Sequence, residues 1–336
     1  MSRRTTNLPT LSDIRDTCLF VAQRSQHVRL NYDNLATFAK TITAPPEHWL
    51  ITNPHNLLSL PLPLLTTILL YFEVIDYSFW PDPPQQNPQT PATTPEFAPQ
   101  KWTVQTPTGP LDGSVALLYH LITNFQQNPS LDFTAFSNAD FYNFFHPAGT
   151  LGEIPLLAER SATLRETSRI LHAKLNNNFY SSIKNFTSDE QLFHFLIATF
   201  PSLHDQRTYI SHTIHFYKLA QLLTSDLLFV RRHLEHISVD TQNLPGCADY
   251  KIPQALRVLN LISYDQELSA LVDTQQLLSE NSPYEVEIRA TTVATIDFLH
   301  QKLPQFSTIQ INDYLFLASR NLPKEQHYHL TRTTNY

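Results

Sequence analysis

The aspartate that follows a Pro-Gly turn is the group in this sequence best placed to do chemistry. Asp249 comes three residues after Gly246 and precedes an apolar run from Ile252 to Ile262 at helical spacing. This pattern places its carboxylate at or just before a helix N-terminus, where free N–H groups and the positive dipole end keep it ionised and oriented. Such an aspartate most often serves only as a helix cap. A positioned carboxylate can also stabilise a developing positive charge and orient water.

Lys218 is the second candidate. On a predicted helix it lies roughly 200° from Phe216 at 100° per residue, opposite the apolar stripe. Gln221 and Ser225 share that polar face. The simpler interpretation is a solvated lysine. The functional alternative is a lysine that faces Asp249 across a cleft, keeps the carboxylate ionised and contacts a substrate.

The composition argues against several function classes. Five glycines occur in 336 residues, and no pair has the spacing of a P-loop or a dinucleotide-binding fingerprint. Any phosphate must therefore be held by side chains or by ordinary helix N-termini. The net charge of −7 argues against polymeric DNA or RNA as a partner, because proteins that grip nucleic acid usually present a basic surface.

Histidine and cysteine spacing predicts no metal site. The histidines at 204, 212 and 215 and the pair at 327 and 329 lack an H-E-x-x-H spacing, and no cysteine is near them. Cys18 and Cys247 form no disulfide framework and suit a reducing compartment. No apolar segment typical of a secretory signal follows the first arginines. We therefore expect a soluble, cytoplasmic protein.

Helical periodicity dominates the chain. Apolar residues recur at helical spacing from Leu157 to Leu175 and from Phe216 to Leu234. The apolar stretch 57–72 is broken by prolines and short for a bilayer, so it predicts a buried helix and no membrane association. Two short β-prone segments, 77–80 and 102–106, could pair as a small ribbon. Further helices are expected at 11–26, 33–43, 111–126, 187–200, 252–262, 265–280, 284–303 and 309–321.

Residues 81–100 are the only low-complexity tract. They are rich in proline, glutamine and threonine and lack the apolar content to pack, which predicts a flexible surface loop. Residues 1–80 show no core of their own, and no internal repeat is apparent. The sequence therefore predicts one mostly α domain over 1–336 with a loop insertion.

Short motifs follow one another from about Ile14 to the last residue. Together they resemble the queuosine salvage protein family, the queuosine 5′-phosphate N-glycosylases that release queuine. The motif with the most information is Ala248-Asp249-Tyr250-Lys251-Ile252-Pro253-Gln254. The others are 76–80, 155–160 with 167–171, 200–202, 216–221, 285–289, and the final Arg332 and Tyr336.

The resemblance implies a helical fold similar to that of helix-hairpin-helix DNA glycosylases. It implies an N-glycosidase that hydrolyses queuosine 5′-phosphate, a small nucleotide, to queuine and ribose 5-phosphate, for salvage of queuine into tRNA modification. Asp249 and Lys218 would be catalytic, and no cofactor would be needed. A 7-deazaguanine lacks the N7 at which a purine can be protonated to make it a better leaving group. More of the catalysis must therefore come from the carboxylate and from contacts to the other edges of the base.

The resemblance also suggests substrate contacts. Phe79, Trp80 and Tyr250 are candidates to stack on the flat base, although each could be a plain core aromatic. Asp76 stands where the family usually has asparagine; it could accept hydrogen bonds from the base but could not donate one. Lys251 stands where the family commonly has arginine, and Arg289, His329 and Arg332 are further candidates for the phosphate.

Two other functions stay open at this point. One is a helical binding or scaffold protein of the same fold whose pocket has decayed, since fold alone never secures function. The other is a base-excision enzyme acting on nucleic acid, against which the negative net charge argues. The sequence does not determine the oligomeric state.

Overall fold

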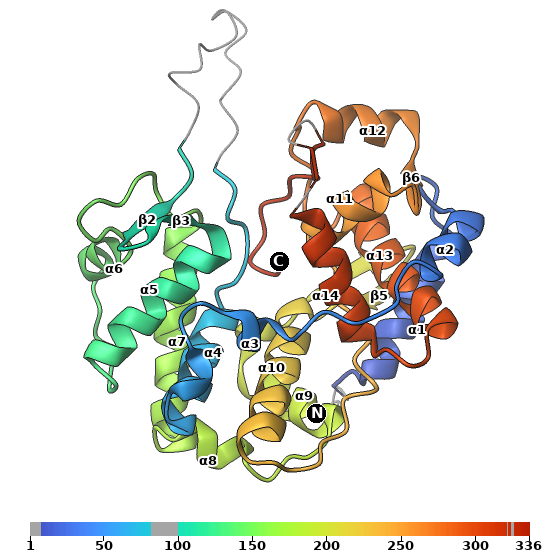
Figure 1. Cartoon of the computed structure of the whole chain (residues 1–336). Coiled ribbons are helices and arrows are strands. Elements are labelled where there is room, and N and C mark those ends of the chain that lie inside the picture. Colours follow the sequence, from blue (N-terminus) through green and yellow to red (C-terminus); the bar gives the residue numbers. More distant parts are fainter. Residues whose placement is uncertain (1–7, 82–99, 321, 324–325) are drawn as a thin grey trace, which may run out of the picture. The chain divides into compact units, whose positions relative to one another are not determined.

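The computed structural model describes residues 8–81, 100–320, 322–323 and 326–336 (Figure 1). The predicted loop at 81–100 lies, apart from its two end residues, outside the described residues. The chain divides into two compact units, one formed by residues up to Leu60 with Ser181–Tyr336 and the other by Pro61–Tyr180. Helices predominate in both, and the described strands form only two-stranded antiparallel pairs, so the mostly α prediction is confirmed. The likeness to helix-hairpin-helix glycosylases stays a prediction.

The first unit carries most of the helices. Its elements in chain order are α1 (Leu11–Ala22), β1 (Val28–Leu30), α2 (Tyr32–Ala39), α3 (Trp49–Thr52), η1 (Leu57–Ser59), α8 (Phe179–Ile183, which spans the boundary), α9 (Asp189–Thr199), η3 (Pro201–Leu203), β4 (Gln206–Tyr209), β5 (His212–His215), α10 (Lys218–Leu234), α11 (Lys251–Val258), β6 (Ile262–Tyr264), α12 (Gln266–Asp273), α13 (Pro283–Lys302) and α14 (Thr308–Ser319). In this unit β1 pairs with β6, and β4 pairs with β5.

Helix α13 forms the centre of this unit. Ser282 caps its N-terminus and Pro283 occupies the first turn, where the missing N–H of proline costs nothing. Helices α1, α2, α11 and α14 pack against it, and it is buried from Glu285 to Asp297. Alanine and threonine fill much of that stretch, and such small side chains allow neighbouring helices to approach closely. A helix covered on every side needs no amphipathic period.

The second unit is built around an aromatic core. Its elements are α4 (Leu62–Glu73), β2 (Thr103–Thr106), β3 (Gly109–Asp112), α5 (Gly113–Gln127), α6 (Asn138–Phe145) and α7 (Leu157–Leu175). The rings of Tyr71, Phe125 and Phe133 contact one another, and Phe141 stacks on Phe133. The Tyr71 hydroxyl lies 2.6 Å from Ser168 Oγ, which joins α4 to α7 within this core.

The predicted β ribbon exists with a different partner. Strand β2 pairs with β3, with Thr103 opposite Asp112 and Thr106 opposite Gly109, so the expected pairing of 102–106 with 77–80 is wrong. Gly109 has φ of +123°, a conformation that favours glycine and allows the tight turn between the two strands. Residues 77–80 form no regular element, because a buried arginine binds the carbonyl groups there, as described below.

The expected polar face of the helix after Phe216 is also wrong. Helix α10 begins at Lys218, and every residue from there to Arg231 except the half-buried Leu222 is buried, including Gln221 and Ser225. Neighbouring elements therefore cover both the apolar stripe and the face that the sequence marks as solvated. Among the described helices, none is both long enough and apolar enough to cross a bilayer.

Candidate active site

Asp249 lies immediately before the residue that caps helix α11, so its predicted place at a helix start is confirmed. Its Oδ1 accepts hydrogen bonds from the backbone N–H groups of Lys251, at 2.9 Å, and Ile252, at 2.8 Å. Tyr250 occupies the N-cap position, and its side chain makes no capping hydrogen bond. Within the described part of the chain no hydrogen bond involves Oδ2 of Asp249. One carboxylate oxygen thus orients the side chain, and the other is available for chemistry.

The electrostatic environment of Asp249 combines opposing effects. Burial raises the pKa of this carboxyl above its usual 3.8, because desolvation penalises the charged form. The positive charge of Lys218, the two backbone N–H groups and the charge of Lys251 all lower that pKa in turn. The net shift is upward. The carboxylate is therefore more basic than that of an exposed aspartate, and the neighbouring positive charges and N–H groups stabilise its ionised form.

Lys218 is the first residue of α10 and is only 5% exposed, so the alternative of a solvated surface lysine is wrong. A buried ammonium is costly, and the N-terminus of a helix is the end at which a cation is disfavoured. The preceding residue, Tyr217, has φ of +52°, which turns the chain sharply into the helix. Because the Lys218 charge acts on the pKa of Asp249, the two side chains are electrostatically coupled.

The loop that carries Asp249 packs tightly against its surroundings. Gly246 has φ of +114°, and a Cβ at this position would lie 2.9 Å from Cγ2 of Ile296 on α13. Only glycine fits there without displacing the central helix. The backbone N–H of Cys247 donates to Oδ1 of Asn312 on α14, at 3.0 Å. The Pro-Gly turn therefore presses this loop onto α13 and α14.

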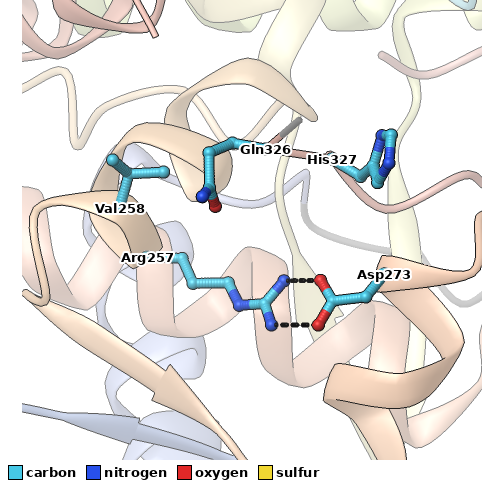
Figure 2. A pocket seen from close by; sticks show the side chains of 5 residues that line it. All are labelled: Arg257, Val258, Asp273, Gln326 and His327. Carbon is cyan, nitrogen blue, oxygen red and sulfur yellow. Dashed lines mark hydrogen bonds and ion pairs between the residues drawn. The ribbon is translucent and has the colours of Figure 1, made fainter. Parts of the chain in front are cut away.

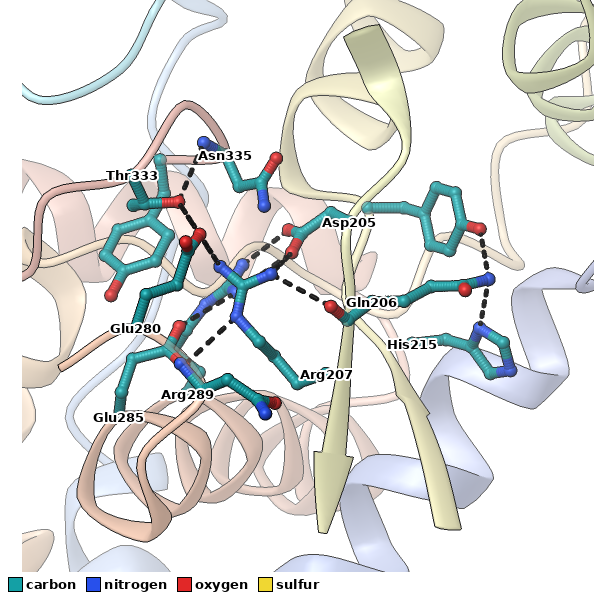
Figure 3. Close-up of polar contacts among 12 residues, drawn as sticks. Asp205, Gln206, Arg207, His215, Glu280, Glu285, Arg289, Thr333 and Asn335 are labelled. Atoms are coloured by element: carbon teal, nitrogen blue, oxygen red, sulfur yellow. Dashed lines mark hydrogen bonds and ion pairs between the residues drawn. The ribbon is translucent and has the colours of Figure 1, made fainter. Parts of the chain in front are cut away.

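Arg289 on α13 is fully buried and forms a bidentate ion pair with Asp205 (Figure 3). Its two terminal nitrogens donate to both carboxylate oxygens of Asp205, at 3.0 and 2.5 Å, and Nη1 also donates to Glu285 at 3.3 Å. The N–H on Nε donates to the carbonyl oxygen of Ala248 at 3.2 Å. The guanidinium is thus bound by acidic partners and by the residue that precedes Asp249.

A second buried arginine extends this network. Arg207 on β4 donates to Glu280 at 2.7 Å, to Glu285 at 3.2 Å and to Oγ1 of Thr333 at 3.2 Å. Figure 3 shows its guanidinium between Glu280 and Asp205, with Thr333 beside it. Glu285 contacts both arginines and so joins Arg207 to Arg289.

The other predicted phosphate ligands lie in different settings. Lys251 and Tyr250 are half-buried; the Lys251 ammonium lies 4.5 Å from the ring centroid of Tyr328, and the Tyr250 ring lies 4.8 Å from the same centroid. Arg332 is half-buried. His329 is 1% exposed, and burial together with the charge of Arg289 lowers its pKa to about 3. His329 is therefore neutral near pH 7 and supplies no positive charge for a phosphate.

Of the predicted base contacts, Asp76, Phe79 and Trp80 belong to the second unit, whereas Tyr250 lies in the first. Asp76 and Phe79 are half-buried, and Trp80 is 3% exposed. Arg160 on α7 organises this segment: its guanidinium donates to the carbonyl groups of Ile75, Tyr77 and Ser78 and to that of Pro155. It also lies over the rings of Tyr77 and Phe79, at 4.4 and 4.8 Å. The irregular stretch after α4 is therefore held by one buried cation.

We expect Arg160→Lys to lower the free energy of unfolding by about 3 kcal/mol. The single ammonium of lysine cannot bind all the carbonyl groups that the planar guanidinium of Arg160 binds at once. Arg165→Lys is the matched control. Arg165 lies on the same helix and binds the Phe136 carbonyl, but it is half-buried, so we expect a loss below about 1 kcal/mol. Urea unfolding followed by circular dichroism compares the two. Equal losses would contradict the organising role of Arg160.

Comparison with known proteins identifies the family. A profile described as queuosine salvage protein matches residues 65–336. The chain belongs to the queuosine salvage protein family. A protein of Sphaerobacter thermophilus named queuosine 5′-phosphate N-glycosylase/hydrolase is 29% identical over 337 residues, which cover 94% of this chain and 95% of that protein. Proteins of the same name match over about half their length: that of Mus musculus is 29% identical over 170 residues (48% of this chain, 50% of that protein), and that of Bos taurus is 31% identical over 152 residues (45% of each).

Two hollows in the described part of the first unit are lined by residues other than Asp249 and Lys218. One, of about 490 Å³, lies beyond the opposite end of α11, where Arg257 and Asp273 form a bidentate ion pair at 2.6 and 2.9 Å beside Gln326 and His327 (Figure 2). The other, of about 440 Å³, lies beside Arg207 and Glu280. Both are lined mainly by polar side chains, and we assign them no part in the chemistry of this queuosine salvage family member. No cluster of three or more potential metal ligands occurs among the described residues.

Several residues around Asp249 were not singled out by sequence reasoning in the roles that they have. The helical pattern places Gln221 on a face that it predicts to be solvated, and no motif marks Asn312 or Asp205. The only sequence signal for any of them is that Gln221 ends the motif 216–221 of the queuosine salvage resemblance. Asp205 and Asn312 lie far from Asp249 in the chain, so no local pattern connects them with it.

Proposed function

We propose that this chain hydrolyses the N-glycosidic bond of queuosine 5′-phosphate and releases queuine and ribose 5-phosphate. The observation that carries the proposal is the half-buried carboxylate of Asp249, oriented at the start of α11 and coupled to the buried Lys218. A relative that bears the name of this activity matches nearly the full length of the chain. The alternative is a binding or scaffold protein of the same fold whose pocket has decayed. Release of queuine by the purified protein would exclude it.

The chemistry assigned to Asp249 follows from the reaction. The bond between C1′ of the ribose and the base breaks with its electron pair going to the base, and an oxocarbenium-like sugar forms. The negative charge of Asp249 stabilises that sugar and orients a water molecule toward C1′. The water oxygen bonds to C1′, and one water proton goes to the ring nitrogen of the departing queuine. Oδ2 of Asp249 would serve in this step, because Oδ1 is bound to the helix N-terminus.

Lys218 would keep Asp249 ionised. Burial alone raises the pKa of Asp249, and a protonated carboxyl could neither stabilise the sugar nor accept a proton from water. The ammonium of Lys218 opposes that effect from the N-terminus of α10. We expect activity to be lost as the pH falls through the pKa of Asp249, since the ionised form is the active one.

The substrate contacts remain proposals. Asp76, Phe79 and Trp80 are proposed to contact the base, with Tyr250 as a further aromatic contact, and Lys251 and Arg332 to hold the 5′-phosphate. We revise the assignment of Arg289: its N–H groups donate to Asp205, Glu285 and Ala248, and the side chain is fully buried. Arg289 is therefore proposed to support the loop of Asp249 and not to bind the phosphate.

Further proposals concern partners and location. No cofactor is needed for a hydrolysis led by a carboxylate. The net charge of −7 supports a small nucleotide, and not polymeric nucleic acid, as the substrate. The two described cysteines are buried thiols, and we propose a cytoplasmic location, where a reducing environment keeps thiols reduced. We also retain the proposal that the whole chain functions as a single queuosine salvage domain.

If the phosphate anchors the substrate, its binding energy should accelerate the chemical step as well as tighten binding. We expect kcat/KM for the 5′-phosphate to exceed that for the nucleoside queuosine by about 10²-fold. Lys251→Met should reduce this ratio by lowering the value for the phosphate alone. Steady-state kinetics on both substrates checks this, and equal kcat/KM values with the wild-type protein would contradict a phosphate anchor.

The activity itself is tested with the purified wild-type protein and queuosine 5′-phosphate. Liquid chromatography with mass detection should show queuine and ribose 5-phosphate appearing in equal amounts, with multiple turnovers. Hydrolysis in water enriched in ¹⁸O should place the label on the sugar and none on queuine. Binding of the nucleotide without any release would favour the decayed binding protein.

A further inference from the structure

Two segments bring Lys218 and Asp249 together, and one buried amide joins them. Gln221 on α10 is fully buried, and its side-chain NH₂ donates to the carbonyl oxygen of Phe216 at 2.8 Å. Its side-chain oxygen accepts from the backbone N–H of Gly246 at 3.1 Å. Phe216 lies two residues before Lys218, and Gly246 lies three residues before Asp249. A single side chain thus ties the turn that leads into α10 to the turn that leads into α11.

Arg289 ties the same two segments at a second point. Its Nε–H donates to the carbonyl oxygen of Ala248, and its guanidinium lies 4.0 Å from the ring centroid of Phe216. The ring of Tyr336 covers the guanidinium at 4.2 Å. Asp205 and Glu285 neutralise the charge, so the arginine is fixed from several sides. Rotating or shifting either segment would break contacts with a fully buried, ion-paired side chain.

We propose that Gln221 and Arg289 are positioning residues that fix the separation between the Lys218 ammonium and the Asp249 carboxylate. Neither residue needs to touch the substrate for this role. Cys247, which lies between Gly246 and Ala248 in the chain, adds a contact of its Sγ with the Lys218 carbonyl oxygen at 3.8 Å. The catalytic meaning of the separation rests on the proposed function, but the separation itself is a property of the folded chain.

The separation matters because the interaction of two charges weakens with distance, and more steeply where water enters between them. The charged groups that act on Asp249 come from several elements: Lys218 from α10 and Lys251 from its own helix. Two acidic residues, Asp205 and Glu285, neutralise Arg289 on α13. Helix α14, which packs on α11, carries a further acidic residue, Asp313. Of the positive charges, that of Lys218 has the largest effect on the Asp249 pKa. Loosening the ties should therefore raise that pKa.

The test compares two buried polar residues of the same helix. Gln221→Met removes both hydrogen bonds while keeping side-chain length. Thr224→Val is the matched control, because Thr224 is also fully buried and donates only to the Ala220 carbonyl of its own helix, at 2.7 Å. We expect Gln221→Met to lower kcat about tenfold or more, with a smaller change in KM, and to move the acid limb of the pH profile upward. Thr224→Val should leave kcat within about twofold of wild type.

The pKa of Asp249 provides a readout that does not depend on turnover. Protein labelled with ¹³C at the aspartate carboxyl carbon can be titrated by NMR, with the Asp249 signal assigned by its loss in Asp249→Asn. Gln221→Met should show a higher pKa for this carboxyl than wild type and Thr224→Val. If Gln221→Met does not fold, Gln221→Asn replaces it, since the shorter amide cannot bridge both backbone groups.

The outcomes are distinct. A wild-type protein that releases no queuine would overturn the proposed function, while the NMR titration would still decide the positioning role. If Gln221→Met has the same Asp249 pKa and the same kcat as Thr224→Val, the positioning role is overturned, even in an active enzyme. A raised pKa together with a reduced kcat, in Gln221→Met alone, would support it.

Discussion

Asp249→Asn should lower kcat for queuine release by about 10²- to 10⁴-fold while leaving nucleotide affinity within a few-fold of wild type. The amide oxygen of asparagine can still accept the hydrogen bonds from Lys251 and Ile252, so the start of α11 is preserved. What the substitution removes is the negative charge beside the forming oxocarbenium ion and the group that orients water. The measurement is the rate of queuine release at saturating queuosine 5′-phosphate.

Asp265→Asn is the control for this substitution. Asp265 caps α12 in the same unit, and its carboxylate accepts from the backbone N–H of Leu268 at 2.8 Å. Asp249 and Asp265 thus make similar contacts with a helix N-terminus, and only the first is proposed to act on the substrate. If both variants retained near-normal turnover, Asp249 would be a structural acceptor and nothing more.

Lys218→Met should lower kcat about 10- to 100-fold and move the acid limb of activity to higher pH. The ionised form of Asp249 is the active one, and the Lys218 charge holds the pKa of that carboxyl down against the effect of burial. Without this charge the pKa rises, so activity is lost at a higher pH as the solution is acidified. The measurement is kcat/KM as a function of pH for the variant and the wild type.

The fold should survive this change. A buried ammonium at a helix N-terminus is unfavourable, and methionine fills a similar volume without a charge. The substitution also removes a positive charge that compensates the buried Asp249 carboxylate, so we expect Lys218→Met to fold with a thermal midpoint somewhat below that of wild type. Lys218→Arg keeps the positive charge and should retain an acid limb near the wild-type position. An unchanged pH profile in Lys218→Met would contradict the coupling between the lysine and Asp249.

The main helices could be predicted because their patterns are local. Apolar spacing and caps such as Ser282 before Pro283 mark where α13 begins, and the Pro-Gly turn with Asp249 marks the start of α11. Helix α6 carries local signals as well, a capping box of Ser137 and Asp140 and two buried phenylalanines four residues apart, whereas the pairing of β1 with β6 has no local pattern. The two strands β1 and β6 are far apart in the chain, and only tertiary contacts bring them together.

The burial of Lys218 could not be predicted from a helical wheel. The wheel distinguishes the apolar stripe from the polar face, but it does not show that neighbouring elements cover the polar face as well. Gln221 illustrates the same limit. Its amide meets Gly246 only after the loop before Asp249 folds over α10, and that contact leaves no trace in residue spacing.

The role of Arg289 required the structure for a related reason. An arginine near predicted binding motifs is a reasonable candidate for a phosphate, and sequence shows nothing of its acidic partners. Glu285 is visible one helical turn away, but Asp205 comes from a separate segment and binds both terminal nitrogens. Once both partners are known, a supporting role for the Asp249 loop explains the full burial of Arg289 better than contact with a substrate.

The central claim is that Asp249 leads the hydrolysis of queuosine 5′-phosphate. Its most direct test measures nucleotide binding by calorimetry and queuine release by mass spectrometry on the same preparations of wild type, Asp249→Asn and Asp265→Asn. We expect all three to bind the nucleotide with similar affinity, and only Asp249→Asn to fail to release queuine. Rapid release by Asp249→Asn, or none by the wild-type protein that binds the nucleotide, would contradict the claim.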